Sequence, residues 1–216
     1  MRRSVRRRIE LRVWARESAT LPWTEAPEDW PTCWRIEAPG LWPLQHGDYA
    51  TGFSAPFATI NAARILIHRR ATLTAKDEQA LLAWAWRWSS GRVALEPSRG
   101  VRRNDFVRLV TCVVERLNGS HGQFVTVSQP WPQRQPSREE FFITLERLIV
   151  GGHVLIAMFK GAHYSVIRGY TAESLLLFDS DGACWVKRGC VAVGSRPAAA
   201  RYALIPGATI ALRRSN

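Results

Sequence analysis

The chain has 216 residues, of which 46% are hydrophobic and 22% charged, a balance typical of one globular domain with or without an extended arm. Its longest strongly apolar runs, such as residues 154–159, are far too short to cross a bilayer. We therefore expect no transmembrane helix. The basic N-terminus lacks the continuous apolar core of a secretory signal peptide, so we expect a cytoplasmic protein.

The net charge of +12 raises the question of a nucleic-acid ligand, because a basic surface attracts phosphates through counterion release. Of the 30 basic residues, 27 are arginine and three are lysine. Alanine is also abundant, so a GC-rich genome accounts for much of the arginine without any ligand. Seven arginines lie in the two tails, where they would suit an acidic protein partner or a membrane surface equally well. Nucleic-acid binding is therefore an alternative and not the main prediction.

Four cysteines are scattered without the paired spacing of a metal site: Cys33, Cys112, Cys184 and Cys190. The five histidines do not cluster with them, whereas zinc ligands in proteins usually come in such clusters. We therefore predict buried thiols, with no metal site and no cofactor.

The first 46 residues differ from the rest of the chain. A basic tail and an alternating segment at 9–14, which favours a strand, precede a region rich in Pro and Trp without a sustained helical period. We expect this region to wrap the body of the protein as an arm anchored by its tryptophans, and a Trp-lined binding groove is the alternative. Residues 47–216 are predicted to form the single domain.

The middle of the chain is predicted to be helical. Residues 57–69 are apolar nearly all round, which is typical of a helix buried inside a domain. Thr74 is the expected N-cap of a second helix, with Asp77 completing an approximate capping box.

Two further helices follow. Asn104 is the expected cap of the third helix, which the pattern ends at Gly119. Ser137 and Glu140 have the spacing of a capping box at the start of the fourth helix, and the glycines at 151–152 are expected to end it.

The last third of the chain consists of short apolar or alternating runs that are typical of β-strands. The short connections between these runs favour antiparallel neighbours. The expected strands are 153–159, 163–170, 174–179, 183–188, 201–205 and 209–213. Helices followed by an antiparallel sheet define an α+β fold.

Two features of these elements suggest acyl-transfer chemistry. Ser54 lies at the start of the buried helix, where the helix dipole and free N–H groups would stabilise a nucleophile. His163 begins a strand, and a hairpin turn at 171–173 would place it opposite Asp181 and diagonal to Asp179 on the same face. A carboxylate can therefore reach the ring and fix its tautomer. The spacing leaves the choice of aspartate open, and the structural alternative is that both aspartates simply belong to a turn at 179–182.

The segments "GFSAPFATINAARIL" and "GGHVLIAMFKGAHYSVIRGYTAESLLLFDSDG" resemble the papain-like cysteine peptidase superfamily, most closely its bacteriocin-processing, double-glycine type. In that family a catalytic Cys opens a buried helix, a His begins a strand, and an Asp ends the next strand. The resemblance covers about residues 47–188. It implies a papain-like fold, in which an N-terminal helical part with the nucleophile helix packs on the C-terminal antiparallel sheet.

By this match Ser54 occupies the nucleophile position, His163 is the base and Asp179 is the orienting carboxylate, with Asp181 as the alternative. The family usually carries an oxyanion-donating Gln about six residues before the nucleophile. Here that position holds Asp48, a poor donor when ionised, and Gln45 is the candidate donor but is displaced by three residues.

The serine at position 54 departs from the family pattern, because a hydroxyl is far harder to deprotonate than a thiol. We interpret Ser54 in four ways: as an engineered replacement of a native cysteine, as the natural residue of a degenerate relative, as a working serine nucleophile, or as a helix cap.

The resemblance implies thiol-dependent hydrolysis of a peptide or isopeptide bond, in a form that is inactive as given. A peptide or protein would lie in the cleft as substrate or partner. The alternatives are a non-catalytic, peptide-binding pseudopeptidase subunit of a larger assembly, and a basic nucleic-acid-associated protein.

Overall fold

The computed structural model of the protein describes residues 34–35, 54–67, 74–92, 101, 103–121, 125–131, 135–159, 163–179, 185–194 and 202–215. The helices in these ranges are α1 (Ser54–Ile67), α2 (Ala75–Arg92), α3 (Arg103–His121) and α4 (Arg138–Val150), with a short 3-10 helix, η1 (Arg188–Cys190). The strands are β1 (Trp34–Arg35), β2 (Val125–Ser128), β3 (His153–Phe159), β4 (His163–Tyr170), β5 (Ser174–Phe178), β6 (Trp185–Lys187), β7 (Val191–Val193) and β8 (Tyr202–Arg214). The protein is therefore mixed helix and antiparallel sheet, as the α+β prediction requires.

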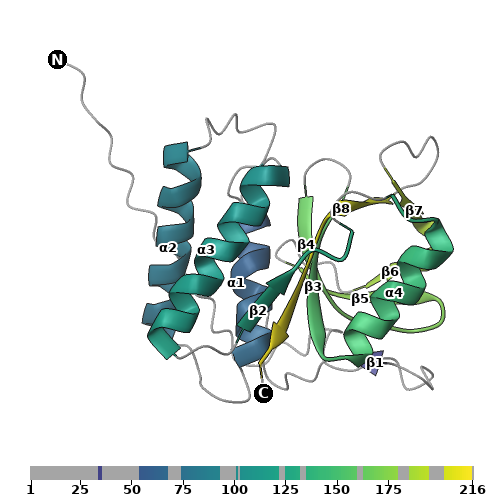
Figure 1. Ribbon diagram of the computed structural model, residues 1–216, viewed down its shortest axis with the longest axis horizontal. Helices are drawn as coiled ribbons and strands as arrows, with labels where there is room; N and C mark the ends of the chain where they lie inside the picture. Colours follow the sequence, from purple (N-terminus) through teal and green to yellow (C-terminus); the bar gives the residue numbers. More distant parts are fainter. Residues whose placement is uncertain are drawn as a thin grey trace, which may run out of the picture.

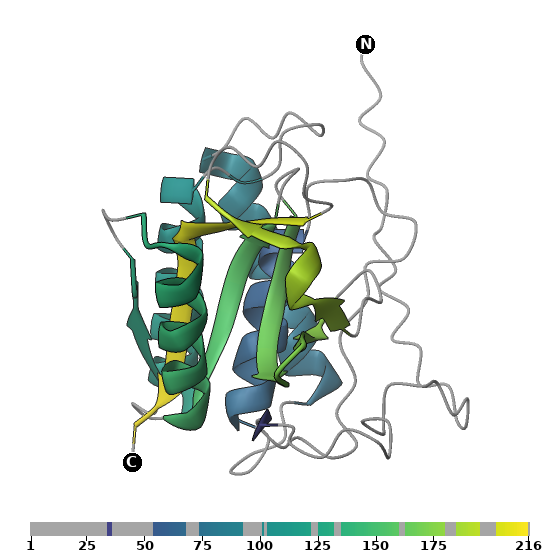
Figure 2. The same ribbon diagram turned by 90° about the vertical axis from the view of Figure 1, so that its right-hand side faces the viewer.

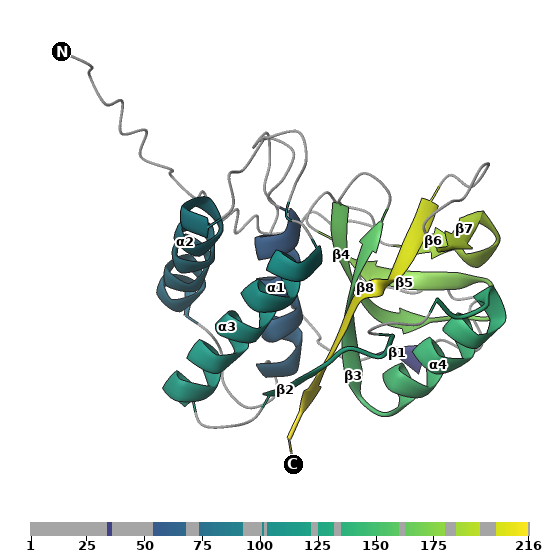
Figure 3. The ribbon, with the colours of Figure 1, turned by 45° about the horizontal axis from the view of Figure 1, so that its top comes forward.

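The strands form one sheet in the order β2-β8-β3-β4-β5-β6, with each neighbour antiparallel to the next. β1 pairs with β4, and β7 runs parallel to β8. Figure 3 shows β8 running along β3, with β2 on its other side. A strand from the end of the sequence thus lies inside the sheet and joins β2 to the β3–β4 hairpin.

Helices cover both faces of this sheet. The helices α1, α2 and α3 lie on one side and α4 on the other (Figure 1). Turned by a quarter, the molecule shows α4 in front of the sheet and α1 behind it (Figure 2). Alternate residues of β3 divide accordingly, since Val154 and Ile156 belong to the core cluster under α1–α3, while Leu155 and Ala157 belong to the cluster under α4. Both faces of β3 are buried, which explains its uninterrupted apolar sequence.

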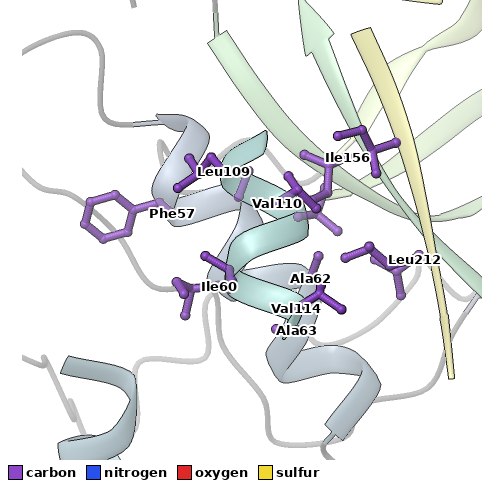
Figure 4. Packing of buried hydrophobic residues seen from close by; sticks show 14 of the residues in the cluster. Phe57, Ile60, Ala62, Ala63, Leu109, Val110, Val114, Ile156 and Leu212 are labelled. Carbon is purple, nitrogen blue, oxygen red and sulfur yellow. The ribbon is translucent and has the colours of Figure 1, made fainter. Parts of the chain in front are cut away.

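The helix α1 is the most deeply buried of the helices, as its apolar sequence predicted. All of its residues except Arg64 are buried, and Arg64 pairs with Glu78 of α2. Small side chains let α1 approach the sheet closely, as Ala62 and Ala63 are both fully buried. Figure 4 shows these alanines and Ile60 beside α3, with Ile156 and Leu212 of the sheet close by.

Two of the predicted helix starts are confirmed by their hydrogen bonds. The hydroxyl of Thr74 accepts from the backbone N–H of Asp77 at 3.2 Å, and the Asp77 carboxylate accepts from the N–H of Thr74 at 3.2 Å. Ser137 and Glu140 make the same reciprocal pair at the start of α4, at 3.2 and 2.9 Å. Each pair satisfies backbone donors that the first helical turn leaves without intrahelical partners.

The prediction for the third helix was wrong at both ends. α3 begins at Arg103, so Asn104 lies in its first turn, and it continues past Gly119 to His121. Gly119 does not end the helix because it does not adopt the positive φ that makes a glycine a helix terminator, which the structure shows at Gly152 with a φ of 80°.

The last two predicted strands are one strand in the structure, because the chain around Pro206 bulges instead of turning away. Against β3, Ile156 pairs with Ile210, whereas Met158 pairs with Ile205. The additional residues on β8 are accommodated between these pairs, and bulges are one of the few positions in a sheet that tolerate proline.

The predicted arm of residues 1–46 is described only at Trp34 and Arg35, which pair with Tyr170 and Gly169 of β4. The predicted strand at 9–14 and the rest of the arm lie outside the described residues.

Candidate functional site

Ser54, the expected nucleophile position, is the first residue of α1 and is 4% exposed. Its Oγ accepts a hydrogen bond of 3.0 Å from the backbone N–H of Tyr164 in β4. Pro56 lies in the first turn of the helix, where a missing N–H costs nothing. The start of α1 is thus fixed directly against the strand that carries His163, one residue before Tyr164.

Tyr164 anchors this strand to the helical layer through its side chain as well. Its ring is fully buried and lies 4.0 Å, centroid to centroid, from the ring of Phe106 in α3. Its hydroxyl donates to the carbonyl of Val101 at 2.9 Å. Burial, and after it the Asp105 carboxylate, raise the pKa of Tyr164 well above its usual value, so the phenol stays protonated and keeps donating.

His163 and Asp179 form a close pair. Nε2 of His163 lies 2.8 Å from Oδ2 of Asp179, whose side chain is 1% exposed, whereas the His163 side chain is 30% exposed. An ionised carboxylate can only accept hydrogen bonds, so it holds the proton on Nε2 and directs Nδ1 as the basic nitrogen. Asp179 is therefore well placed to orient the ring, while part of the imidazole reaches the surface.

The hairpin register explains why this aspartate reaches the ring. Val166 pairs with Phe178 and Ile167 with Leu177, as the predicted turn requires, and one irregularity follows before Gly169. Asp179 directly follows β5 and lies diagonal to His163 on the same face of the sheet. The alternative carboxylate Asp181 lies outside the described residues.

The two residues considered for the oxyanion position, Gln45 and Asp48, also lie outside the described residues. The described part of the site therefore consists of Ser54, the Tyr164 backbone and the His163–Asp179 pair. It combines a hydroxyl at a helix N-terminus, a backbone donor to that hydroxyl and an imidazole held by a carboxylate.

A further polar residue on this face was not singled out from the sequence. Ser165 is 1% exposed, and its Oγ has no hydrogen-bond partner in the part of the chain that the structure describes. The signal that would have found it is its place in the alternation of β4, since Ser165 follows His163 by two positions and so shares its face.

A concave surface with a volume of about 760 Å³ lies beside the turn that joins β4 and β5, at the end of β4 opposite to His163. The guanidinium group of Arg188 lies 4.4 Å above the ring of Phe142 here and donates to the carbonyls of Thr171 and Ala172. Arg138 donates to the carbonyl of Arg188. These contacts tie α4, the turn and η1 together, so both arginines have a structural role and the surface is separate from the His163 site.

The cysteines correct one prediction. Cys190 is exposed and Cys112 half-buried, so not all the thiols are buried, and Cys33 and Cys184 lie outside the described residues. Cys190 escapes burial because it ends the short η1 helix on the rim of the concave surface. Within the described ranges, His, Cys, Asp and Glu form no group of three or more that could hold a metal ion. None of the described helices combines the length and apolar character needed to cross a bilayer.

Comparison with known proteins finds no match to this chain among protein-family models, curated proteins or solved structures. Its function is therefore inferred from the geometry of its own residues.

Proposed function

We propose that the chain carries a papain-like acyl-transfer site of the cysteine-peptidase type, with serine at the nucleophile position. The proposal rests on one observation above all, the 2.8 Å hydrogen bond between His163 and the buried Asp179. Tyr164, the residue after His163 in β4, contacts Ser54 through its backbone N–H. In this proposal residue 54 is the nucleophile, His163 the base and Asp179 the residue that orients it. The substrate is a peptide or isopeptide bond.

With a thiol at position 54, the proposed reaction proceeds in two steps. His163 takes the thiol proton at Nδ1, and the thiolate attacks the carbonyl carbon. The imidazolium then gives this proton to the leaving amine, which leaves an acyl-enzyme. A water molecule, deprotonated by His163, hydrolyses the acyl-enzyme and restores the thiol. The N-terminus of α1 and the Tyr164 N–H would stabilise negative charge on the attacking atom.

With serine at position 54 the same site is inactive in thiol chemistry, and the second candidate function follows from this. The Ser54 hydroxyl is buried and already accepts the Tyr164 N–H, an arrangement that suits a fixed structural serine. A non-catalytic module that binds a peptide in the same place, as a subunit of a larger assembly, is therefore the alternative. Both functions use His163, but only the first requires it to activate residue 54.

The test is to replace Ser54 by cysteine and to measure labelling of the new thiol with iodoacetamide by intact mass and peptide mapping. We expect the introduced thiol to react at least about tenfold faster near neutral pH than an ordinary exposed thiol, because the helix N-terminus and His163 favour the thiolate. The double variant Ser54→Cys/His163→Ala should lose this acceleration. Exposed Cys190 serves as the reference thiol within the same molecule.

A second control separates the helix dipole from the histidine. Ser137 also starts a helix, but it is exposed and caps α4 away from His163, so Ser137→Cys places a thiol at a helix N-terminus without that base. Labelling of the Ser54→Cys thiol that equals that of Ser137→Cys, and that ignores His163→Ala, would contradict the proposal and favour the binding module.

A further inference from the structure

Ser165 has a buried hydroxyl in the buried part of β4. Its side chain is 1% exposed, and its Oγ has no hydrogen-bond partner among the residues that the structure describes. Buried polar groups are almost always hydrogen-bonded, because an unsatisfied donor loses its interaction with water without compensation. An unpartnered serine at this position therefore needs a physical explanation.

The neighbours of Ser165 provide one. On β3 its partner is Ala157, whose side chain is a single methyl group with nothing to offer a hydroxyl. On the other side, Val166 pairs with Phe178, so the next position along the hairpin places Ser165 opposite Asp179. Side chains directly opposite one another in an antiparallel pair have Cβ atoms about 5 Å apart. Ser165 is thus the polar residue across from the carboxylate that holds His163.

We propose that Ser165 is a positioning residue for the His163–Asp179 pair, with its hydroxyl donating to the Asp179 carboxylate directly or through one water molecule. A serine hydroxyl turns between three staggered positions about χ1, which brings the donor toward the carboxylate without moving the backbone. The base role of His163 rests on the proposed function, but the contact between Ser165 and Asp179 does not.

The physical benefit lies in the burial of Asp179. A carboxylate that is 1% exposed stays charged only if hydrogen-bond donors replace the water it has lost. One oxygen accepts from His163, and a carboxylate can accept about four hydrogen bonds in total. A donor from the neighbouring strand fixes the plane of the carboxylate, and this plane in turn fixes the His163 ring.

The first test is the sign of the change in melting temperature on Ser165→Ala. Removing a hydroxyl that donates to a buried carboxylate lowers the melting temperature, whereas removing an unpartnered hydroxyl raises it. We expect a decrease. Ser174→Ala is the matched control, because Ser174 is also a buried serine in a strand but lies at the turn end of the same hairpin. An increase for Ser165→Ala would overturn the proposal.

The second test reads the His163 ring itself in the otherwise unmodified chain. The Nε2 proton shared with Asp179 gives an imidazole NMR signal that is assigned by its loss in His163→Ala. We expect Ser165→Ala to accelerate solvent exchange of this proton by about tenfold, as for the loss of one hydrogen bond to a charged group. Ser165→Thr, which keeps the hydroxyl, should retain slow exchange, and Ser174→Ala should have no effect. Unchanged exchange in Ser165→Ala would refute the positioning role.

The third test links the contact to the proposed function. In the Ser54→Cys background, Ser165→Ala should slow iodoacetamide labelling by roughly three- to tenfold, and Ser165→Thr should restore it. If the Ser54→Cys thiol is not activated in the first place, the proposed function fails, while the exchange of the Nε2 proton still decides the role of Ser165. If the thiol is activated and Ser165→Ala labels as fast, the proposed function stands and Ser165 does not support it.

Discussion

The two histidines that begin β3 and β4 have almost opposite environments. Because the strands are antiparallel, His153 and His163 lie at opposite ends of the sheet. His153 donates from Nδ1 to the carbonyl of Leu148 at 3.0 Å, one of the last carbonyls of α4, so it caps the helix. His163 has a buried carboxylate as its partner instead.

The two histidine rings differ in the polar and charged groups that surround them. Burial lowers the pKa of His153, the bond to the Leu148 carbonyl acts in the other direction, and Arg213 lowers it further. His153 is thus held as a neutral structural group. At His163 the partner is instead the buried Asp179 carboxylate, which can only accept a hydrogen bond and so holds the ring through Nε2. Two half-buried histidines on one hairpin can therefore be distinguished by their partners, although their exposure alone does not separate them.

The largest expected effect comes from removing the His163 ring. His163→Ala removes one charged partner of the buried Asp179 carboxylate, and breaking such a buried pair costs several kcal/mol. Because the ring is partly exposed, we expect a loss of about 3 kcal/mol in the free energy of unfolding, measured by urea denaturation.

The charge of Asp179 provides the control for this experiment. In the double variant His163→Ala/Asp179→Asn the buried group is neutral, so part of the lost stability should return. Additive losses from the two substitutions would show that the pair is not energetically coupled, and the contrast with His153 would disappear.

How far the site was predictable depends on the range of the contacts that build it. Alternation along β4 and a short turn were enough to place His163 near Asp179 and Asp181, without choosing between them, because all three are set within one hairpin. The contact between Ser54 and the Tyr164 N–H joins residues 110 positions apart, and no local pattern specifies it. Only the family resemblance suggested that the two segments meet.

The fold shows the same division. The capping boxes of α2 and α4 and the β3–β4 hairpin follow from spacings of a few residues. The strand β2 was missed because its four residues are too few to show a recognisable pattern. It forms only by pairing with β8, which lies far later in the sequence, at Tyr202–Arg214. The burial of Ser165 was missed too, since it depends on helices that cover both faces of the sheet.

A smaller effect on stability is expected from removing the Tyr164 hydroxyl. This hydroxyl anchors β4 to Val101 and does not contact the His163–Asp179 pair. Tyr164→Phe keeps the ring contact with Phe106 but leaves the buried Val101 carbonyl without this donor. We expect a loss of about 1–2 kcal/mol in the free energy of unfolding, with the His163 Nε2 proton signal unchanged. Loss of that signal would mean that the Tyr164 hydroxyl, and not Asp179 alone, determines the ring position.

His153→Ala should cost less than His163→Ala, because it removes one neutral hydrogen bond and leaves no buried charge. We expect a loss of about 1 kcal/mol in the free energy of unfolding, measured by the same urea titrations, because the C-terminal turn of α4 loses this hydrogen bond. His153→Gln, which can donate to the Leu148 carbonyl, is the conservative control. A cost equal to that of His163→Ala would remove the distinction between a capping histidine and a paired one.

The smallest effect is the pH dependence that His153 gives to stability. Because its pKa in the folded state is lowered below the ordinary value of 6.5, the unfolded chain binds more protons at this position just below pH 6.5. Its contribution to stability is therefore complete above pH 6.5 and declines as the pH falls from there toward the folded-state pKa. Melting temperatures of the wild-type chain and His153→Gln, compared between pH 5 and 8, should diverge only in that acidic range. Arg213→Gln should reduce the divergence, because Arg213 is one of the groups that keep the ring neutral, and an unchanged or inverted divergence would show that the charge environment of His153 has been wrongly assigned.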